Sequence, residues 1–282
     1  MDFRSFNDVL RLERTGRDTF STVGVHARPD DQMRLFGGQV AAQSLRAAAN
    51  TVDAPHHPHA VHAQFLDGGR RDLPIEYRVE RVRDGRSFTR RHVEAHQGGR
   101  MIFELDASFH ADEEGPDLAT PVAPDFPHPE DAAEGMYRDG KPDQRTPWGD
   151  EFELRQVVRS DTPGPMEPAV RFWARSRDTV PGDRAGTACM LLYVSDIHSG
   201  AAGVVATGTR FRDLIGGVVS LDHAMWFHRP MPDPQEWFSM DVRTVSVGES
   251  RSLFFATIHA LSGAHVASYT QEVLFRVRRH GG

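Results

Sequence analysis

The sequence predicts an α+β fold of two tandem modules, each with an antiparallel sheet wrapped around a central helix. Three observations predict this fold. A helical pattern near residue 40 is rich in alanine on nearly every side, strand-like segments follow it, and a similar order of segments recurs later in the chain. The length of 282 residues is sufficient for two domains of ordinary size.

The first segments are predicted to be a short helix over residues 6–12 and a strand over residues 20–25. A longer helix is predicted over residues 36–50. Its side chains are small all round and it lacks a large charged face, so we expect a sheet to cover it. Gly37 and Gly38 leave backbone N–H groups approachable at its positive end, which makes both glycines candidate substrate-binding residues.

Four strands are predicted after this helix, over residues 61–66, 75–83, 87–96 and 100–110. The composition then changes to a proline-rich, acidic stretch, which we interpret as a linker running over the surface. The predicted organisation is therefore an N-terminal module, a linker and a C-terminal module, over residues 1–112, 113–149 and 150–282.

The second half resembles the first at the level of single residues. A His-Ala dipeptide followed by large apolar residues occurs in both halves, which pairs His62 with His223. Residues 99–109 likewise resemble residues 263–273. Because the matched segments keep their order, we interpret the chain as a duplication.

One segment combines apolar bulk with several polar groups, and we predict a single extended strand over residues 220–230. Alternation places His223 on one face and Ser220, Asp222 and Trp226 on the other. Since both faces carry apolar residues, the strand is expected to be covered on both sides, where its polar groups need partners. Asp222 and His223 point to opposite faces, so they are expected to have structural roles rather than to form a dyad.

The composition excludes several kinds of protein. A net charge of −7 gives no general attraction to nucleic acid or anionic lipid. No run of 18 apolar residues and no signal-peptide pattern is found, so we expect a soluble, cytoplasmic protein with no membrane partner. Cys189 is the only cysteine, which excludes intrachain disulfides and argues against a cysteine-based zinc site.

A group of histidines raises the question of a metal site. These residues occur in a proline-containing segment without a supporting pattern of carboxylates, and we interpret the segment as a solvated loop; they are His56, His57, His59 and His62. We therefore expect no metal and no other cofactor.

Several motifs together resemble the acyl-CoA thioesterase II family, whose fold is a double hotdog. The most specific is the run Asp-His-Ala-Met-Trp-Phe-His-Arg-Pro over residues 222–230. The others are Phe-Gly-Gly-Gln at 36–39, Arg-Asp-Gly-Arg-Ser-Phe at 83–88, Ala-Ser-Phe at 107–109 and Gln-Glu at 271–272. The resemblance covers most of the chain outside the linker. It implies a thioester hydrolase of fatty acid and lipid metabolism, with acyl-CoA as substrate, that forms homo-oligomers.

The resemblance also implies the catalytic residues. In the family an Asp, a Ser or Thr and a Gln hold the hydrolytic water, and by motif these are Asp196, Ser220 and Gln271. All three lie in the second half. The repeat places Ala107 where Gln271 stands, so the first half is expected to be a scaffold that has lost its site.

Two departures from the family pattern are visible. The family continues after residues 65–66 with an Arg-Pro-Gly-Asp turn, whereas this chain has Asp-Gly-Gly-Arg at 67–70. The second central helix is expected to begin near Asp196, and the glycines at 200, 203 and 208 predict that it is short or irregular. Both departures are expected to affect the pocket for the substrate.

Thioester hydrolysis needs an aimed water, a group that takes its proton and donors for the oxyanion. Asp196 is the candidate base, and at a helix start it would also serve as an N-cap. Ser220 and Gln271 are not strong bases, so they are expected to position the water by hydrogen bonds. No Gly-x-Ser-x-Gly elbow surrounds Ser220, which argues against an acyl-enzyme.

Two other functions remain open on sequence grounds. The first is a non-catalytic acyl-CoA-binding protein of the same fold. The second is a hotdog hydratase or dehydratase, which needs an Asp and a His paired on the central helix. Asp196 and His198 are the only such pair there, and two residues apart on a helix they diverge.

Overall fold

The structure is a computed structural model that describes residues 5–23, 34–138, 141–142, 151–157, 169–197, 200–231 and 233–278. His198 and the end of the strand predicted over residues 20–25 lie outside the described residues. The first half contains α1 (Phe6–Leu10), β1 (Leu12–Gly16), β2 (Thr19–Thr22), α2 (Gly37–Ala49), β3 (His56–Phe65), β4 (Glu76–Asp84), β5 (Phe88–Gln97) and β6 (Arg100–Ala111).

Short elements join the halves: the 3-10 helix η1 (Pro129–Asp131), β7 (Ala133–Glu134), β8 (Tyr137–Arg138) and β9 (Lys141–Pro142). The second half then contains β10 (Phe152–Gln156), β11 (Ala169–Ser176), α3 (Arg184–Ser195), α4 (Ala201–Ala206), the 3-10 helix η2 (Phe211–Asp213), β12 (Leu214–Ser220), β13 (Asp222–Phe227), β14 (Phe238–Gly248), β15 (Arg251–Ala260) and β16 (His265–Val277).

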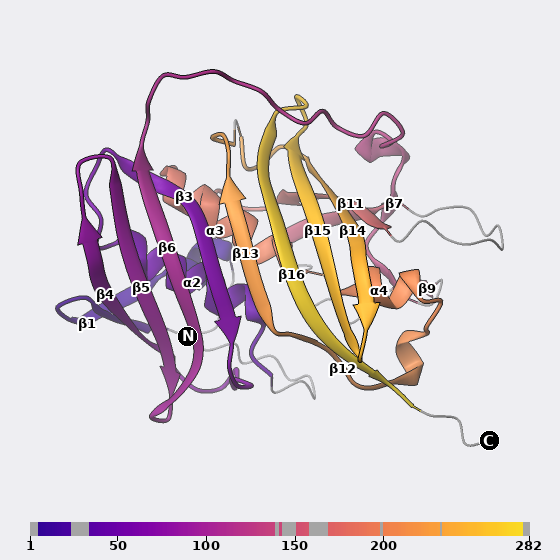
Figure 1. Cartoon of the computed structure of the whole chain (residues 1–282), viewed down its shortest axis with the longest axis horizontal. Coiled ribbons are helices and arrows are strands. Elements are labelled where there is room, and N and C mark those ends of the chain that lie inside the picture. The colour runs from indigo at the N-terminus through magenta and orange to yellow at the C-terminus, as the bar shows by residue number, and fades with distance from the viewer. Residues whose placement is uncertain are drawn as a thin grey trace.

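The strands of both halves form one continuous sheet (Figure 1). The order is β1-β2-β4-β5-β6-β3 in the first half and β13-β16-β15-β14-β11-β10-β7 in the second, with β12 also paired to β16. Corresponding strands therefore run outward from the centre, where β3 and β13 pair antiparallel. The predicted duplication is visible as this mirrored order of strands around two central helices.

The two long helices lie together on one side of the sheet, behind it in the view of Figure 1. α2 contacts α3 and several strands of the first half. Ten of the thirteen residues of α2 are buried, which confirms the expectation that an alanine-rich helix without a charged face is covered by a sheet. Small side chains let the two helices pack closely.

The histidine segment is not the loop that the sequence predicted. His56, His57, His59 and His62 all belong to β3, which pairs with β6 from His56 opposite Ala111 onward. Pro58 led to the loop prediction, but it lies at an irregularity of the register between Pro58 and Ala60, where a missing backbone N–H is tolerated. Among the described residues, no group of three or more His, Cys, Asp or Glu is placed to hold a metal ion.

The alignment of the two His-Ala dipeptides is wrong by one residue. His223 is 1% exposed, whereas His62 is exposed on the other face of the sheet. The interior residue of β3 that lies opposite Ala107 is Val61, so Val61 corresponds to His223. The match of Ala107 with Gln271 agrees with this register, because both are buried.

The predicted single strand over residues 220–230 is interrupted. Ser220 lies opposite Val273 and Ala224 lies opposite Thr270, so residues 221–223 face only residues 271–272. This extra residue is a β-bulge, and the Asp222 carboxylate accepts a hydrogen bond from the backbone N–H of Glu272 there (2.7 Å). The bulge turns both Ser220 and His223 toward the interior, whereas simple alternation had placed them on opposite faces. Asp222 and Trp226 are not covered as fully as predicted, since Asp222 is exposed and Trp226 is half-buried.

The predicted linker does not run wholly over the surface. β7, inside residues 113–149, extends the sheet by pairing with β10, and Pro129, Ala132 and Met136 are buried. A strand at an open edge needs a partner, and β7 supplies one to β10. Within the linker, Ala133 and Glu134 thus belong to the second half of the sheet.

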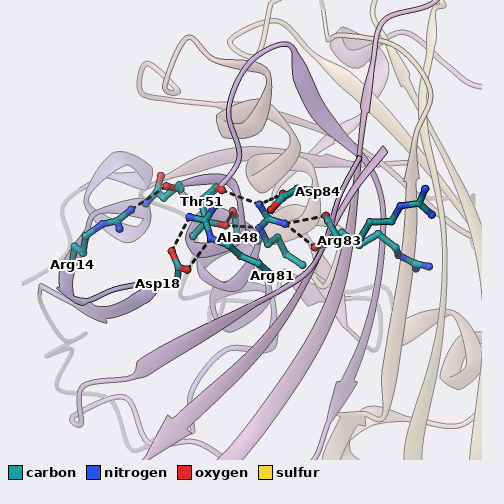
Figure 2. A network of polar contacts seen from close by, with 10 residues as sticks. Arg14, Asp18, Ala48, Thr51, Arg81, Arg83 and Asp84 are labelled. Carbon is teal, nitrogen blue, oxygen red and sulfur yellow. Dashed lines mark hydrogen bonds and ion pairs between the residues drawn. The ribbon is translucent and has the colours of Figure 1, made fainter. Parts of the chain in front are cut away.

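A buried arginine holds the C-terminal end of α2. Arg91 of β5 is 1% exposed and donates hydrogen bonds to the Oγ1 and the carbonyl oxygen of Thr51 (2.8 and 3.0 Å) and to the Asp84 carboxylate (2.6 Å). Figure 2 shows Thr51, Arg83 and Asp84 gathered around this network. A cation at the negative end of a helix is favourable, and here it fixes the position of α2 along the sheet.

Candidate active site

Asp196 lies where α3 ends, not where it begins. The apolar run over residues 184–195 forms the second central helix, and Asp196 is its C-cap. The glycines expected to make the helix irregular come after it, where α4 is a separate short helix. The N-cap role predicted for Asp196 was therefore wrong, and Asp183 is the N-cap of α3.

The three predicted catalytic residues lie together. The Oδ1 atom of Asp196 accepts hydrogen bonds from the Ser220 hydroxyl (2.9 Å) and from the Gln271 Nε2 (2.7 Å). Ser220 ends β12, and Gln271 is in the middle of β16, 1% exposed. Two strands of the second half, β12 and β16, thus bring polar groups to the carboxylate at the end of α3.

The first half supplies a third partner of the Asp196 carboxylate. The backbone N–H of Gly38, in the first turn of α2, donates to the Asp196 Oδ2 (2.9 Å). A Cβ atom on the preceding residue, Gly37, would lie 2.6 Å from the same oxygen and 2.7 Å from Phe65. Only glycine allows the helix start to approach the carboxylate this closely. Gly38 therefore helps to hold Asp196. Of the two glycines, Gly37 and not Gly38 lines the adjacent cavity.

Two opposing effects act on the charge of Asp196. Burial raises the pKa of its carboxyl group above the usual value of 3.8, because the ionised form loses solvation. The hydrogen bonds from Gln271, Ser220 and the Gly38 N–H lower the pKa, but they do not offset the effect of burial. The result is a carboxylate that is more basic than an exposed aspartate.

A cavity of about 540 Å³ opens beside Asp196 and Ser220. Most of its walls are apolar, and they come from both halves: Phe36, Val40, Phe65, Ile102, Phe211, Val218, Leu221 and Val273. Arg34 and Arg71 lie in the same lining, as do Asp67, Gly68 and Gly69 from the turn that departs from the family pattern. A cavity of this size, with both apolar walls and several charged groups, suits a small organic ligand that has an apolar part and a polar part.

Sequence reasoning expected His223 to be covered, but it missed that His223 lies on the same side of the sheet as Ser220. Its Nδ1 lies 3.0 Å from the Gln271 Oε1 and its Nε2 lies 3.0 Å from the Ser195 Oγ. Asp222 and His223 point to different sides, as predicted, and neither contacts the other. The signal in the sequence was a His three residues after the candidate Ser, but only the bulge at residues 221–223 shows that both face the interior.

Comparison with known proteins decides the family. The family model described as the acyl-CoA thioesterase N-terminal domain matches residues 25–110, and the one described as the acyl-CoA thioesterase C-terminal domain matches residues 129–275. Human acyl-coenzyme A thioesterase 8 is 32% identical over 287 residues, covering 96% of this chain and 88% of the relative. The chain belongs to the acyl-CoA thioesterase family. It is accordingly a thioester hydrolase, and the resemblance seen in its motifs is confirmed.

Solved structures of similar proteins agree with this membership. An acyl-CoA thioesterase II, TesB2, from Mycobacterium marinum is 32% identical, with a TM-score of 0.82 over 98% of this chain and 100% of that one. A conserved protein with a hot dog fold from Alicyclobacillus acidocaldarius is 20% identical, with a TM-score of 0.77 over 97% of this chain and 98% of its own, which shows the fold alone. The double hotdog fold of this thioesterase is thereby confirmed.

Proposed function

We propose that this protein hydrolyses acyl-CoA to a free acid and CoA by direct attack of a water molecule. One observation carries the proposal: the Asp196 carboxylate, beside an apolar cavity, is held by Ser220, Gln271 and the N–H of Gly38. A buried, more basic carboxylate suits a general base, and the apolar lining suits an acyl chain.

Asp196 takes a proton from the water as the water oxygen bonds to the thioester carbonyl carbon. Ser220 already donates its hydroxyl proton to Asp196, so its oxygen is suited to accept a hydrogen bond from the water. Gln271 has a second N–H, which is suited to contact the same water. The tetrahedral oxyanion then collapses, the C–S bond breaks, and the leaving thiolate receives the proton from Asp196.

Gly37 is our candidate for an oxyanion donor. It is the first residue of α2, a position whose backbone N–H has no acceptor within the helix. It lines the cavity next to Asp196, and the helix dipole adds positive potential there. The carbonyl oxygen of the thioester, with its developing negative charge, is expected to lie against this N–H.

The hydratase alternative finds less support in this geometry. It requires an imidazole near the carboxylate. Its candidate, His198, lies outside the described residues, and within them the His223 ring is linked to Asp196 through Gln271. A hydrolysis assay, and not the geometry, distinguishes a non-catalytic acyl-CoA-binding protein from the proposed enzyme.

The test is hydrolysis of a panel of acyl-CoA substrates, followed by detection of the free thiol. Asp196→Asn should lower kcat on the order of 10²-fold or more, because the proton acceptor is lost. Ser220→Ala and Gln271→Ala should each cost about 10-fold, the value of one hydrogen bond. Asp196→Asn combined with Gln271→Ala should be little worse than Asp196→Asn alone, since both act on one water. A fully active Asp196→Asn variant, or an acyl-enzyme on Ser220 after rapid quenching, would overturn the mechanism.

We further propose that the protein acts in the cytoplasm and forms homo-oligomers. No described helix has the length and apolar character needed to cross a membrane. Leu253 and Phe255 of β15 leave 38% and 40% of their side chains exposed, and such residues on a sheet face favour association. Light scattering should give a multiple of 31.5 kDa, and a mass equal to that of one chain would contradict self-association.

A further inference from the structure

The hydrogen-bond network around Asp196 does not stop at Gln271. The amide oxygen of Gln271 contacts the His223 ring, and the opposite ring nitrogen contacts the hydroxyl of Ser195 at the end of α3. His223 and Ser195 are 1% and 0% exposed, so neither is available to solvent or substrate. The chain Asp196, Gln271, His223, Ser195 is therefore an interior network that leads away from the cavity.

The chemistry of each group fixes the direction of these hydrogen bonds. An ionised Asp196 only accepts, so the Gln271 atom 2.7 Å away must be its NH₂ group. The Gln271 oxygen then faces the His223 Nδ1, which must carry the hydrogen. The Ser195 Oγ lies 3.0 Å from the unprotonated Nε2 and 2.9 Å from the Leu192 carbonyl oxygen. Because a hydroxyl has one proton and both of these atoms are acceptors, the Nδ1–H tautomer requires that proton to turn from Leu192 toward Nε2.

The surroundings of the ring keep it singly protonated. Burial lowers the pKa of His223 to about 4, so the neutral imidazole is present at neutral pH and its single proton has one defined site. The ring stacks on Tyr269 with centroids 5.3 Å apart and planes at 24°. This stacking and the bulge at residues 221–223 hold the ring in place beside Gln271.

We propose that His223, as the Nδ1–H tautomer, is a positioning residue that fixes the orientation of the Gln271 amide, so that its NH₂ group faces Asp196 and the hydrolytic water. This rests on the proposed role of Gln271. With the amide reversed, its oxygen would face the Asp196 carboxylate, two acceptors would oppose each other and a donor to the water would be lost. Ser195 supports the arrangement by occupying the Nε2 atom.

Two variants separate this role from a structural one. His223→Leu fills a similar volume but donates no hydrogen bond, and it should lower kcat on the order of 10-fold with little change in KM. His223→Asn places an amide N–H near the position of Nδ1–H and should recover most of the loss. His223→Leu combined with Gln271→Ala should be no worse than Gln271→Ala alone, because both remove the same function. His62→Leu, on the paired strand but facing the other side, is the matched control.

A measurement on the unmodified protein tests the tautomer without reference to activity. Nitrogen-15 NMR of the labelled histidines should show His223 protonated at Nδ1 and not at Nε2, with the His223→Asn spectrum used for assignment. Protonation at Nε2 would overturn the proposal, as would a fully active His223→Leu variant. A fully active Asp196→Asn variant would overturn the hydrolysis mechanism even if His223 is the Nδ1–H tautomer. A fully active Gln271→Ala variant would overturn the His223 proposal, because His223 is proposed to act through Gln271.

Discussion

The charge of one residue, Asp196, links the stability of this protein to its proposed chemistry. Its folded-state pKa is raised, so the folded protein prefers the protonated carboxyl group, and this preference is lost as the pH rises through that pKa. The folded protein is thus less stable with Asp196 ionised, the form that the reaction needs, than with Asp196 protonated. The donors Gln271, Ser220 and Gly38 N–H limit this cost while leaving the carboxylate basic.

This balance predicts a pH dependence. As the pH falls through the raised pKa of Asp196, kcat/KM for acyl-CoA should fall, because a protonated carboxyl group does not accept the proton of water. Gln271→Ala removes a hydrogen bond that lowers this pKa, so its acid limb should move to higher pH. Asp222→Asn is the control, since burial also raises the pKa of Asp222 but its carboxylate only holds the Glu272 N–H. If the acid limb moved in Asp222→Asn and not in Gln271→Ala, the titrating group would be Asp222 and not Asp196.

At the level of residues, the motifs predicted the three proposed catalytic residues but not the residues that support them. Asp196, Ser220 and Gln271 were proposed together and lie together. Alternation did not predict that His223 lies on the same side as Ser220. The extra residue between them reverses the face of every residue that follows it in the strand.

Among the elements, α2 has the clearest dual role. Its first turn provides the N–H that holds Asp196, and Arg91 binds Thr51, the residue that follows its C-cap. The boundaries of α2 were predictable because small residues fill one continuous stretch, which begins with Gly37 and Gly38. Those of α3 were not, because residues 184–195 lack an amphipathic pattern: nine of them are buried, and a helix buried all round gives no periodic signal.

The Arg91 anchor predicts a large effect on stability. Arg91→Met keeps an unbranched chain but removes the guanidinium, leaving the Thr51 oxygens without their donor. The free energy of unfolding, measured with urea, should fall by about 2–4 kcal/mol, as expected for unpaired buried polar groups. Arg90→Met, one residue earlier and exposed, should change it by less than about 0.5 kcal/mol. Equal losses in the two variants would show that the anchor adds nothing beyond the packing of β5.

For the whole molecule, the duplication places one site at the junction of two halves. The residues proposed for catalysis come from the second half, but Phe36, Val40 and Phe65 of the first half line the cavity, and the Gly38 N–H holds Asp196. The sequence predicted the duplication from recurring segments. The sequence also named Gly37 and Gly38 of the first half as candidate substrate-binding residues. It did not show that the Gly38 N–H contacts Asp196, because a contact between residues 158 positions apart leaves no local pattern.

Cutting the chain tests whether both halves are required. The segment around residues 115–116 is exposed and outside regular secondary structure, so separate expression of residues 1–115 and 116–282 breaks no strand or helix. Each fragment leaves a central strand, β3 or β13, as an open edge and exposes one side of the cavity. Neither fragment should hydrolyse acyl-CoA alone, whereas co-expression should restore activity by pairing β3 with β13. The intact protein cleaved at an inserted protease site between residues 115 and 116 is the control and should stay active. Full activity of residues 116–282 alone would mean that α2 and the Gly38 N–H are dispensable for the reaction.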